Sequence, residues 1–136
     1  MRAQDLAVQI RKLRRPKKTQ GHCYELSGQI VCRADKAMTL ALVHGEVSRK
    51  IGERIGHAWV EKGNLVYDVV LDQFFSVSHY YEKFDVKVVS RYFWQEAAKQ
   101  VIRFKHWGPW ENVMGVEHVS TGSGKLAVTT RRYKGL

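Results

Sequence analysis

The segment GHAWVEKGNLVYD, from Gly56 to Asp68, decides the fold because it joins two strand-like runs through a turn. Lys62-Gly63-Asn64 is a turn-forming tripeptide, and strand-forming residues flank it on both sides. A hairpin that turns about Lys62 and Gly63 places His57 directly opposite Asp68. A carboxylate there would hold one ring N–H of the histidine and leave the other nitrogen free to act as a base. The segment therefore predicts a His-Asp pair, to which a nucleophile must be added.

Cys23 is the candidate nucleophile, in the upstream segment TQGHCYELSGQIVC. The apolar residues that follow it have a helical period, so we expect Cys23 at the start of a helix. The partial positive charge of a helix N-terminus, with a protonated histidine beside it, favours the thiolate form of a cysteine. A cysteine in this place is more often a plain core residue, and we interpret Cys32 as one. Together with His57 and Asp68, Cys23 predicts a Cys-His-Asp triad.

These pieces resemble the papain-like and transglutaminase-like thiol enzymes. The similarity is closer to small bacterial and phage proteins, and here it rests on Cys23-Tyr24, His57-Ala58-Trp59-Val60, Tyr67-Asp68 and Gly108-Pro109-Trp110, across about residues 20 to 110. The resemblance implies a papain-like core in which the helix that bears the cysteine packs on a small antiparallel sheet. It also implies that Cys23 is the nucleophile, His57 the base and Asp68 the residue that orients the histidine. Asp72 is the alternative third member.

Four further residues are candidates for supporting parts of such a site. Gln20 lies just upstream of the cysteine, as an oxyanion-stabilising Gln does in papain-like enzymes, and the backbone N–H of Cys23 is a second donor. Trp59 shares a strand face with the candidate base, so it is either a wall of the substrate cleft or a core aromatic. Trp107 and Trp110 flank a Gly-Pro pair and either border the cleft or fill the base of the sheet.

The net charge of the 136-residue chain is +10, from 23 basic and 13 acidic residues, and it is concentrated at the two ends. Subtracting both ends leaves twelve residues of each sign in the body. We therefore expect a basic helix or arm at 1–18, a papain-like catalytic domain at 19–124 and a basic strand and tail at 125–136. The ends either engage nucleic acid or an acidic protein surface, or are simply solvated. The residues concerned are Arg11, Lys12, Arg14, Arg15, Lys17, Lys18, Arg131, Arg132 and Lys134.

Composition argues against several classes of protein. No apolar run approaches the ~18 residues of a membrane span, and the N-terminus is too charged for a signal peptide, so we expect a cytoplasmic protein. Cys23 and Cys32 on one helix would be too far apart to form a disulfide, which also suits a reducing compartment. The histidines do not have the spacing of metal ligands, and no CxxC or HExxH motif occurs. We expect neither a metal nor a cofactor.

The remaining patterns predict an α+β fold. Apolar periodicity and turn signals suggest an amphipathic helix at 3–14, a strand at 38–47, an irregular aromatic segment at 74–84, a strand at 86–89, a helix at 93–104 and a hairpin of 113–119 with 125–130. Two functions are compatible with this chain. One is a thiol hydrolase or acyl transferase acting on an amide, isopeptide or thioester of a protein or peptide. The other is a catalytically silent binding or inhibitor module that uses its basic ends.

Deletion of residues 1–18 tests whether the basic N-terminus contacts nucleic acid. If its side chains neutralise phosphates, binding depends steeply on salt because counterions are released, and it tolerates any base sequence. The truncated chain should then show a flatter salt dependence, measured by fluorescence anisotropy with a labelled DNA duplex. Unchanged binding after the deletion would exclude this segment as the contact.

Overall fold

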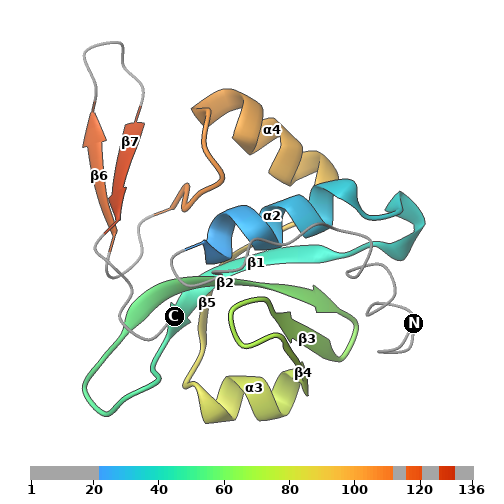
Figure 1. Cartoon of the computed structure of the whole chain (residues 1–136), viewed down its shortest axis with the longest axis vertical. Helices are drawn as coiled ribbons and strands as arrows, with labels where there is room; N and C mark the ends of the chain where they lie inside the picture. Colours follow the sequence, from blue (N-terminus) through green and yellow to red (C-terminus); the bar gives the residue numbers. More distant parts are fainter. Residues whose placement is uncertain (1–21, 112–115, 121–125, 131–136) are drawn as a thin grey trace.

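The computed structural model describes residues 22–111 and two further strands at 116–120 and 126–130, which together have an α+β fold (Figure 1). Strands β1 to β5 form one antiparallel sheet in the order β4-β3-β2-β1-β5, and β6 pairs with β7 in a separate antiparallel hairpin. The elements are, in order, α2 (Cys23–Arg33), η1 (Lys36–Met38), β1 (Ala41–Val47), β2 (Ile55–Lys62), β3 (Leu65–Asp68), β4 (Gln73–Ser76), α3 (Val77–Lys83), β5 (Lys87–Tyr92), α4 (Trp94–Phe104), β6 (Val116–Ser120) and β7 (Leu126–Thr130).

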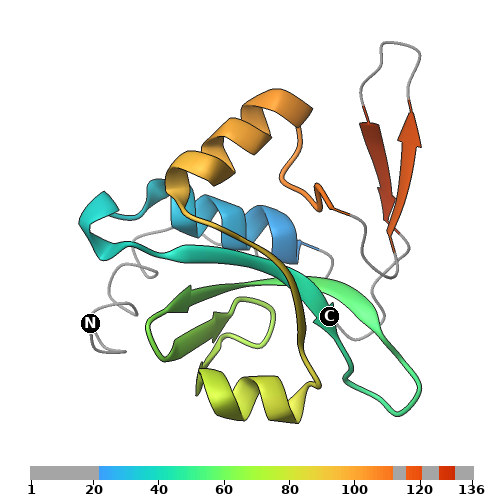
Figure 2. The same ribbon diagram turned by 180° about the vertical axis from the view of Figure 1, so that it is seen from behind.

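Helices cover both faces of the five-stranded sheet. The two views from opposite sides place α2 and α4 over one face and α3 over the other (Figures 1 and 2). Side chains alternate along a strand, so His44 of β1 contacts Tyr24 of α2, whereas Trp59 of β2 contacts Tyr80 of α3. Because neither face is open to water, β1 and β2 are buried at nearly every position.

The hairpin of β2 and β3 has a different register from the one predicted. The turn residues are Gly63 and Asn64, and the directly opposed pairs include Val60 with Tyr67 and Glu61 with Val66. Gly63 has a positive φ of 56°, which glycine tolerates at the first central position of a tight hairpin turn, so Lys62 stays in the strand. The prediction that His57 pairs directly with Asp68 is therefore wrong by two residues. An even shift keeps every side chain on its predicted face.

Most of the predicted elements are present. The Cys23 helix, the strands near 38–47 and 86–89, the helix near 93–104 and the C-terminal hairpin correspond to α2, β1, β5, α4 and the β6–β7 pair. The aromatic segment at 74–84 was wrongly predicted to be irregular, because it contains most of β4 and all of α3. Helix α3 begins where the Ser76 hydroxyl accepts a hydrogen bond from the backbone N–H of His79 at 3.2 Å. The predicted helix at 3–14 lies outside the described residues.

Gly45 of β1 provides a test of how tightly the sheet is packed. A Cβ atom at this position would lie 2.5 Å from the backbone oxygen of Lys87 and 2.8 Å from the Trp59 ring. Gly45→Ala should therefore lower the free energy of unfolding by about 1–3 kcal/mol, measured by urea denaturation. Gly63→Asn is the control, since its Cβ would meet no atom within 4 Å and Asn tolerates a positive φ. Equal stability of both variants would contradict this packing.

Candidate functional site

His57 and Asp68 form a buried pair on the α3 face of the sheet. The His57 Nε2 atom lies 2.8 Å from Asp68 Oδ2, and both side chains are 0% exposed. Continuing the observed register one step beyond Val60 and Tyr67 places Asp68 across from Trp59, so His57 is its diagonal neighbour. An imidazole is long enough to span such a diagonal. The predicted contact therefore forms, although through a different register.

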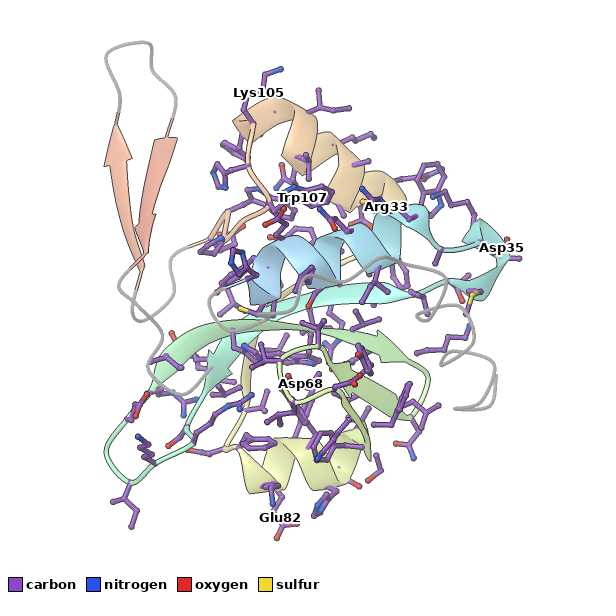
Figure 3. All side chains as sticks on the ribbon, in the orientation of Figure 1. Arg33, Asp35, Asp68, Glu82, Lys105 and Trp107 are labelled. Atoms are coloured by element: carbon purple, nitrogen blue, oxygen red, sulfur yellow. The ribbon has the colours of Figure 1, made fainter. Side chains whose placement is uncertain are left out.

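Asp68 is held by five hydrogen bonds. Its Oδ2 atom accepts from His57, from the Tyr80 hydroxyl at 2.7 Å and from Arg49 Nη2 at 3.0 Å, and its Oδ1 atom accepts from the backbone N–H groups of Val70 at 2.9 Å and Leu71 at 3.0 Å. Burial alone would raise the pKa of the carboxyl group, but the charge of His57 and the hydrogen bonds of His57 and Tyr80, with Arg49 adding its charge, hold that pKa well below its ordinary value. Figure 3 shows Asp68 between the sheet and α3. The carboxylate is therefore charged and fixed in orientation.

Cys23 is the first residue of α2 and is also 0% exposed. Burial alone would lower the pKa of His57, but the charges of Asp68 and then Cys23, together with the hydrogen bond to Asp68, raise that pKa to about 9. Asp68 occupies Nε2, so Nδ1 is the ring nitrogen left for the thiol. The buried Nδ1 atom has no hydrogen-bond partner within the described part of the chain, and the charge of Cys23 acts on the same ring. The structure thus brings Cys23, His57 and Asp68 together.

The start of α2 also presents backbone donors. The first intrahelical bond runs from the N–H of Leu26 to the oxygen of His22, and no side chain caps the helix. The N–H of Cys23 therefore lies among the groups that lack an intrahelical acceptor. The neighbouring His22 is engaged elsewhere, because its ring lies 3.5 Å from Glu25 and about half of each side chain is exposed.

The alternative third member, Asp72, belongs to a different contact. It accepts a hydrogen bond from the Tyr67 hydroxyl at 2.6 Å, while Asp68 takes the place beside His57.

Trp59 and Trp110 are buried, whereas Trp107 is only partly buried. Trp59 is 0% exposed, and its ring N–H donates to Glu61 at 2.8 Å. Trp107 packs over Gly28 of α2, where a Cβ atom would come within 2.6 Å of its ring, and Figure 3 places it on the other side of the sheet from Asp68. Trp110 is buried against His44 and Tyr92. Trp59 and Trp110 have the contacts of core aromatics, whereas Trp107 covers Gly28 of α2 and remains partly exposed.

Sequence reasoning missed several polar residues around the site. No sequence pattern distinguishes Arg49, which lies between two predicted strands, and Tyr80 lies in the aromatic segment that was predicted to be irregular. A second buried carboxylate, Glu61, accepts from Trp59 and from the Tyr81 hydroxyl, and Arg91 lies beside it at 3.5 Å. The N-cap pattern at Ser76 was the one available signal, since it predicts a helix that carries these tyrosines.

His44 is a second buried histidine, on the opposite face from His57. Neither of its ring nitrogens has a hydrogen-bond partner within the described residues. The rings of Tyr24, Trp110 and Tyr92 surround it, with centroids 4.8, 5.0 and 5.2 Å away. Burial in this aromatic cage, and secondarily the nearby His106, lower its pKa to about 3. His44 is therefore neutral at ordinary pH.

Several candidates cannot be placed. Gln20 and the basic residues of both ends, Arg11, Lys12, Arg14, Arg15, Lys17, Lys18, Arg131, Arg132 and Lys134, lie outside the described residues. Within the described ranges, no group of three or more His, Cys, Asp or Glu side chains is arranged to hold a metal ion. No helix in the same ranges has the length and apolar character needed to cross a membrane.

Comparisons of the chain with protein-family models, with curated proteins and with solved structures give no match. The function of the chain is therefore inferred from the geometry of its own residues.

The two buried histidines should affect stability in opposite pH ranges. The pKa of His57 is raised in the folded state, so its stabilisation is complete below about 6.5 and is lost as pH rises through about 9. The pKa of His44 is lowered, so its contribution is complete above about 6.5 and is lost as pH falls toward 3. The free energy of unfolding of the wild-type protein should therefore fall by about 3 kcal/mol between pH 6.5 and 9, and His57→Gln should abolish this fall. His44→Gln should flatten only the acidic side. Urea denaturation across pH measures both effects, and variants that keep the wild-type slopes would contradict them.

Proposed function

We propose that this protein is a thiol hydrolase or acyl transferase with a papain-like core and a Cys23-His57-Asp68 triad. The observation that carries the proposal is the 2.8 Å bond between His57 Nε2 and Asp68 Oδ2, with Cys23 acting on the same ring at the first residue of a helix. Three separate segments supply these groups. A buried histidine held between a carboxylate and a thiol has the arrangement that activates a nucleophile.

The substrate in this proposal is an amide, isopeptide or thioester of a protein or peptide. Ionised Asp68 is an acceptor only, so Nε2 of His57 carries a hydrogen and Nδ1 exchanges the reacting proton with Cys23. The Cys23 sulfur attacks the carbonyl carbon, and the negative charge that develops on oxygen is stabilised by the N–H groups at the start of α2. His57 then protonates the leaving group as its bond to carbon breaks, which leaves an acyl thioester on Cys23.

The second half of the reaction restores the enzyme. Water or an amine gives a proton to His57 and attacks the thioester carbon, and the carbon–sulfur bond breaks. The Cys23 thiolate and protonated His57 are recovered. Hydrolysis, deamidation and transamidation share the first half-reaction and differ in which group is released first and which arrives second.

A silent binding or inhibitor module is the second candidate, and one observation favours it. Cys23, His57 and Asp68 are all 0% exposed, so a substrate reaches the sulfur only if the covering residues move. A protein that uses the fold for binding alone does not need an accessible cysteine, so complete burial of these side chains is compatible with it.

Alkylation by iodoacetamide at pH 6.5 distinguishes the two candidates. Burial raises the pKa of Cys32, so its thiol stays protonated at this pH, whereas Cys23 faces the positive charge of His57. Cys23 should react roughly tenfold faster or more than Cys32 in the folded protein, as followed by peptide mass spectrometry. His57→Ala should slow the reaction of Cys23, and Asp68→Asn should slow it less.

His22→Ala is the matched control for the histidine variant, because His22 adjoins Cys23 in sequence but pairs with Glu25. It should leave the labelling rate unchanged. If Cys23 reacts only in urea, or reacts equally fast without His57, the thiol-enzyme proposal is wrong and the binding module is the better explanation.

A further inference from the structure

Arg49 reaches the site from the β1–β2 loop, residues 48–54. Its guanidinium lies 3.0 Å from Asp68 Oδ2 and over the Phe84 ring at 5.2 Å, and its side chain is only 12% exposed. Ile51, two residues further along the loop, is fully exposed. The loop therefore turns one arginine into the interior while its tip remains in solvent.

The charged and titratable groups around this point come from five elements. Cys23 belongs to α2, His57 to β2, Asp68 to β3, Tyr80 to α3 and Arg49 to the β1–β2 loop. The pKa of Tyr80 is raised well above its ordinary value by burial and by Asp68, so this hydroxyl stays a neutral donor. The nearby carboxylate of Glu61 has its own partners, among them Arg91.

Arg49 changes the net charge of the buried cluster. When Cys23 and His57 share one proton, Asp68 and Arg49 cancel each other and the buried cluster is neutral. A second proton makes the cluster positive, which is costly away from water. Without Arg49, the same second proton would bring the cluster from negative to neutral and would be taken up readily.

We propose that Arg49 is a positioning residue that keeps the Cys23–His57 pair in its one-proton form by balancing the charge of Asp68. This inference rests on the proposed function, because it concerns the same triad. Arg49 binds the oxygen atom that also holds His57, so it acts on the thiol through Asp68 and the imidazole. It lies 19 residues before Asp68 in sequence and contributes from a loop rather than from the sheet.

The test follows the thiolate of Cys23 directly by its ultraviolet absorbance, which needs no access for a reagent. The protein carries Cys32→Ser, and a Cys23→Ser protein provides the baseline across the pH series. Arg49→Met and Arg49→Gln should move the pH at which the thiolate signal disappears on acidification upward by about one unit or more. At a fixed pH below that point, this corresponds to a loss of about tenfold in thiolate.

Three further variants isolate the role of charge. Arg49→Lys keeps the positive charge and should restore most of the wild-type profile. Tyr80→Phe removes a neutral donor to the same oxygen and should shift the profile less than Arg49→Met. Arg54→Met is the matched control, because Arg54 lies on the same loop but bonds to Glu46 at 3.1 Å and to Asp85. It should leave the profile unchanged.

The outcomes separate this inference from the proposed function. If the protein with only Cys32→Ser shows no thiolate signal near neutral pH, the proposed Cys23-His57-Asp68 triad is wrong. A wild-type signal that depends on His57, with profiles unmoved by Arg49→Met and Arg49→Gln, would overturn the role of Arg49 alone. A single titration near that of a free thiol, about 8.5, in these variants would mean that Arg49 only holds the structure closed, and would also overturn it.

Discussion

A carboxylate removed from water is stable only if its charge and lone pairs are satisfied, and Asp68 meets this condition with five hydrogen bonds. The donors come from β2, α3, the β1–β2 loop and the turn after β3, so one side chain joins β3 to a helix, a loop and a turn as well as to its neighbouring strand. Loss of a single donor would leave buried charge poorly compensated. The position of His57, and therefore of any chemistry at Cys23, depends on this network.

Polar side chains are buried on both faces of the sheet, but their surroundings differ. On the α3 face, Asp68 and Glu61 each gather donors, and the Trp59 ring packs between the two groups. On the α2 face, His44 is enclosed by aromatic rings and has no hydrogen-bond partner among the described residues. A polar network specifies one geometry because its bonds are directional, whereas an aromatic cage excludes a charge. The alternation of side chains along β1 and β2 keeps these environments separate.

Local patterns predicted much of this architecture. Apolar periodicity was sufficient for α2 and α4, and the Lys62-Gly63-Asn64 turn was sufficient for the hairpin. The register was wrong because two adjacent dipeptides can form a tight turn, and both give the same alternation of faces. Arg49 and Tyr80 could not be assigned, since only the folded chain brings a loop and a helix to the end of β3. Helix α3 was not predicted because its aromatic residues have no clear helical periodicity, and its N-cap at Ser76 is a weaker signal than such periodicity.

The diagonal placement of His57 and Asp68 limits how the length of the hairpin can vary. Lengthening each strand by one residue would carry both side chains along together and keep them on one face. A single inserted residue would turn one strand over and direct either the imidazole or the carboxylate to the side occupied by His44. Residues added to or removed from these two strands should therefore come in pairs, one in each strand, if the His57–Asp68 contact is to persist, whereas a change in the separate β6–β7 sheet would leave that contact in place.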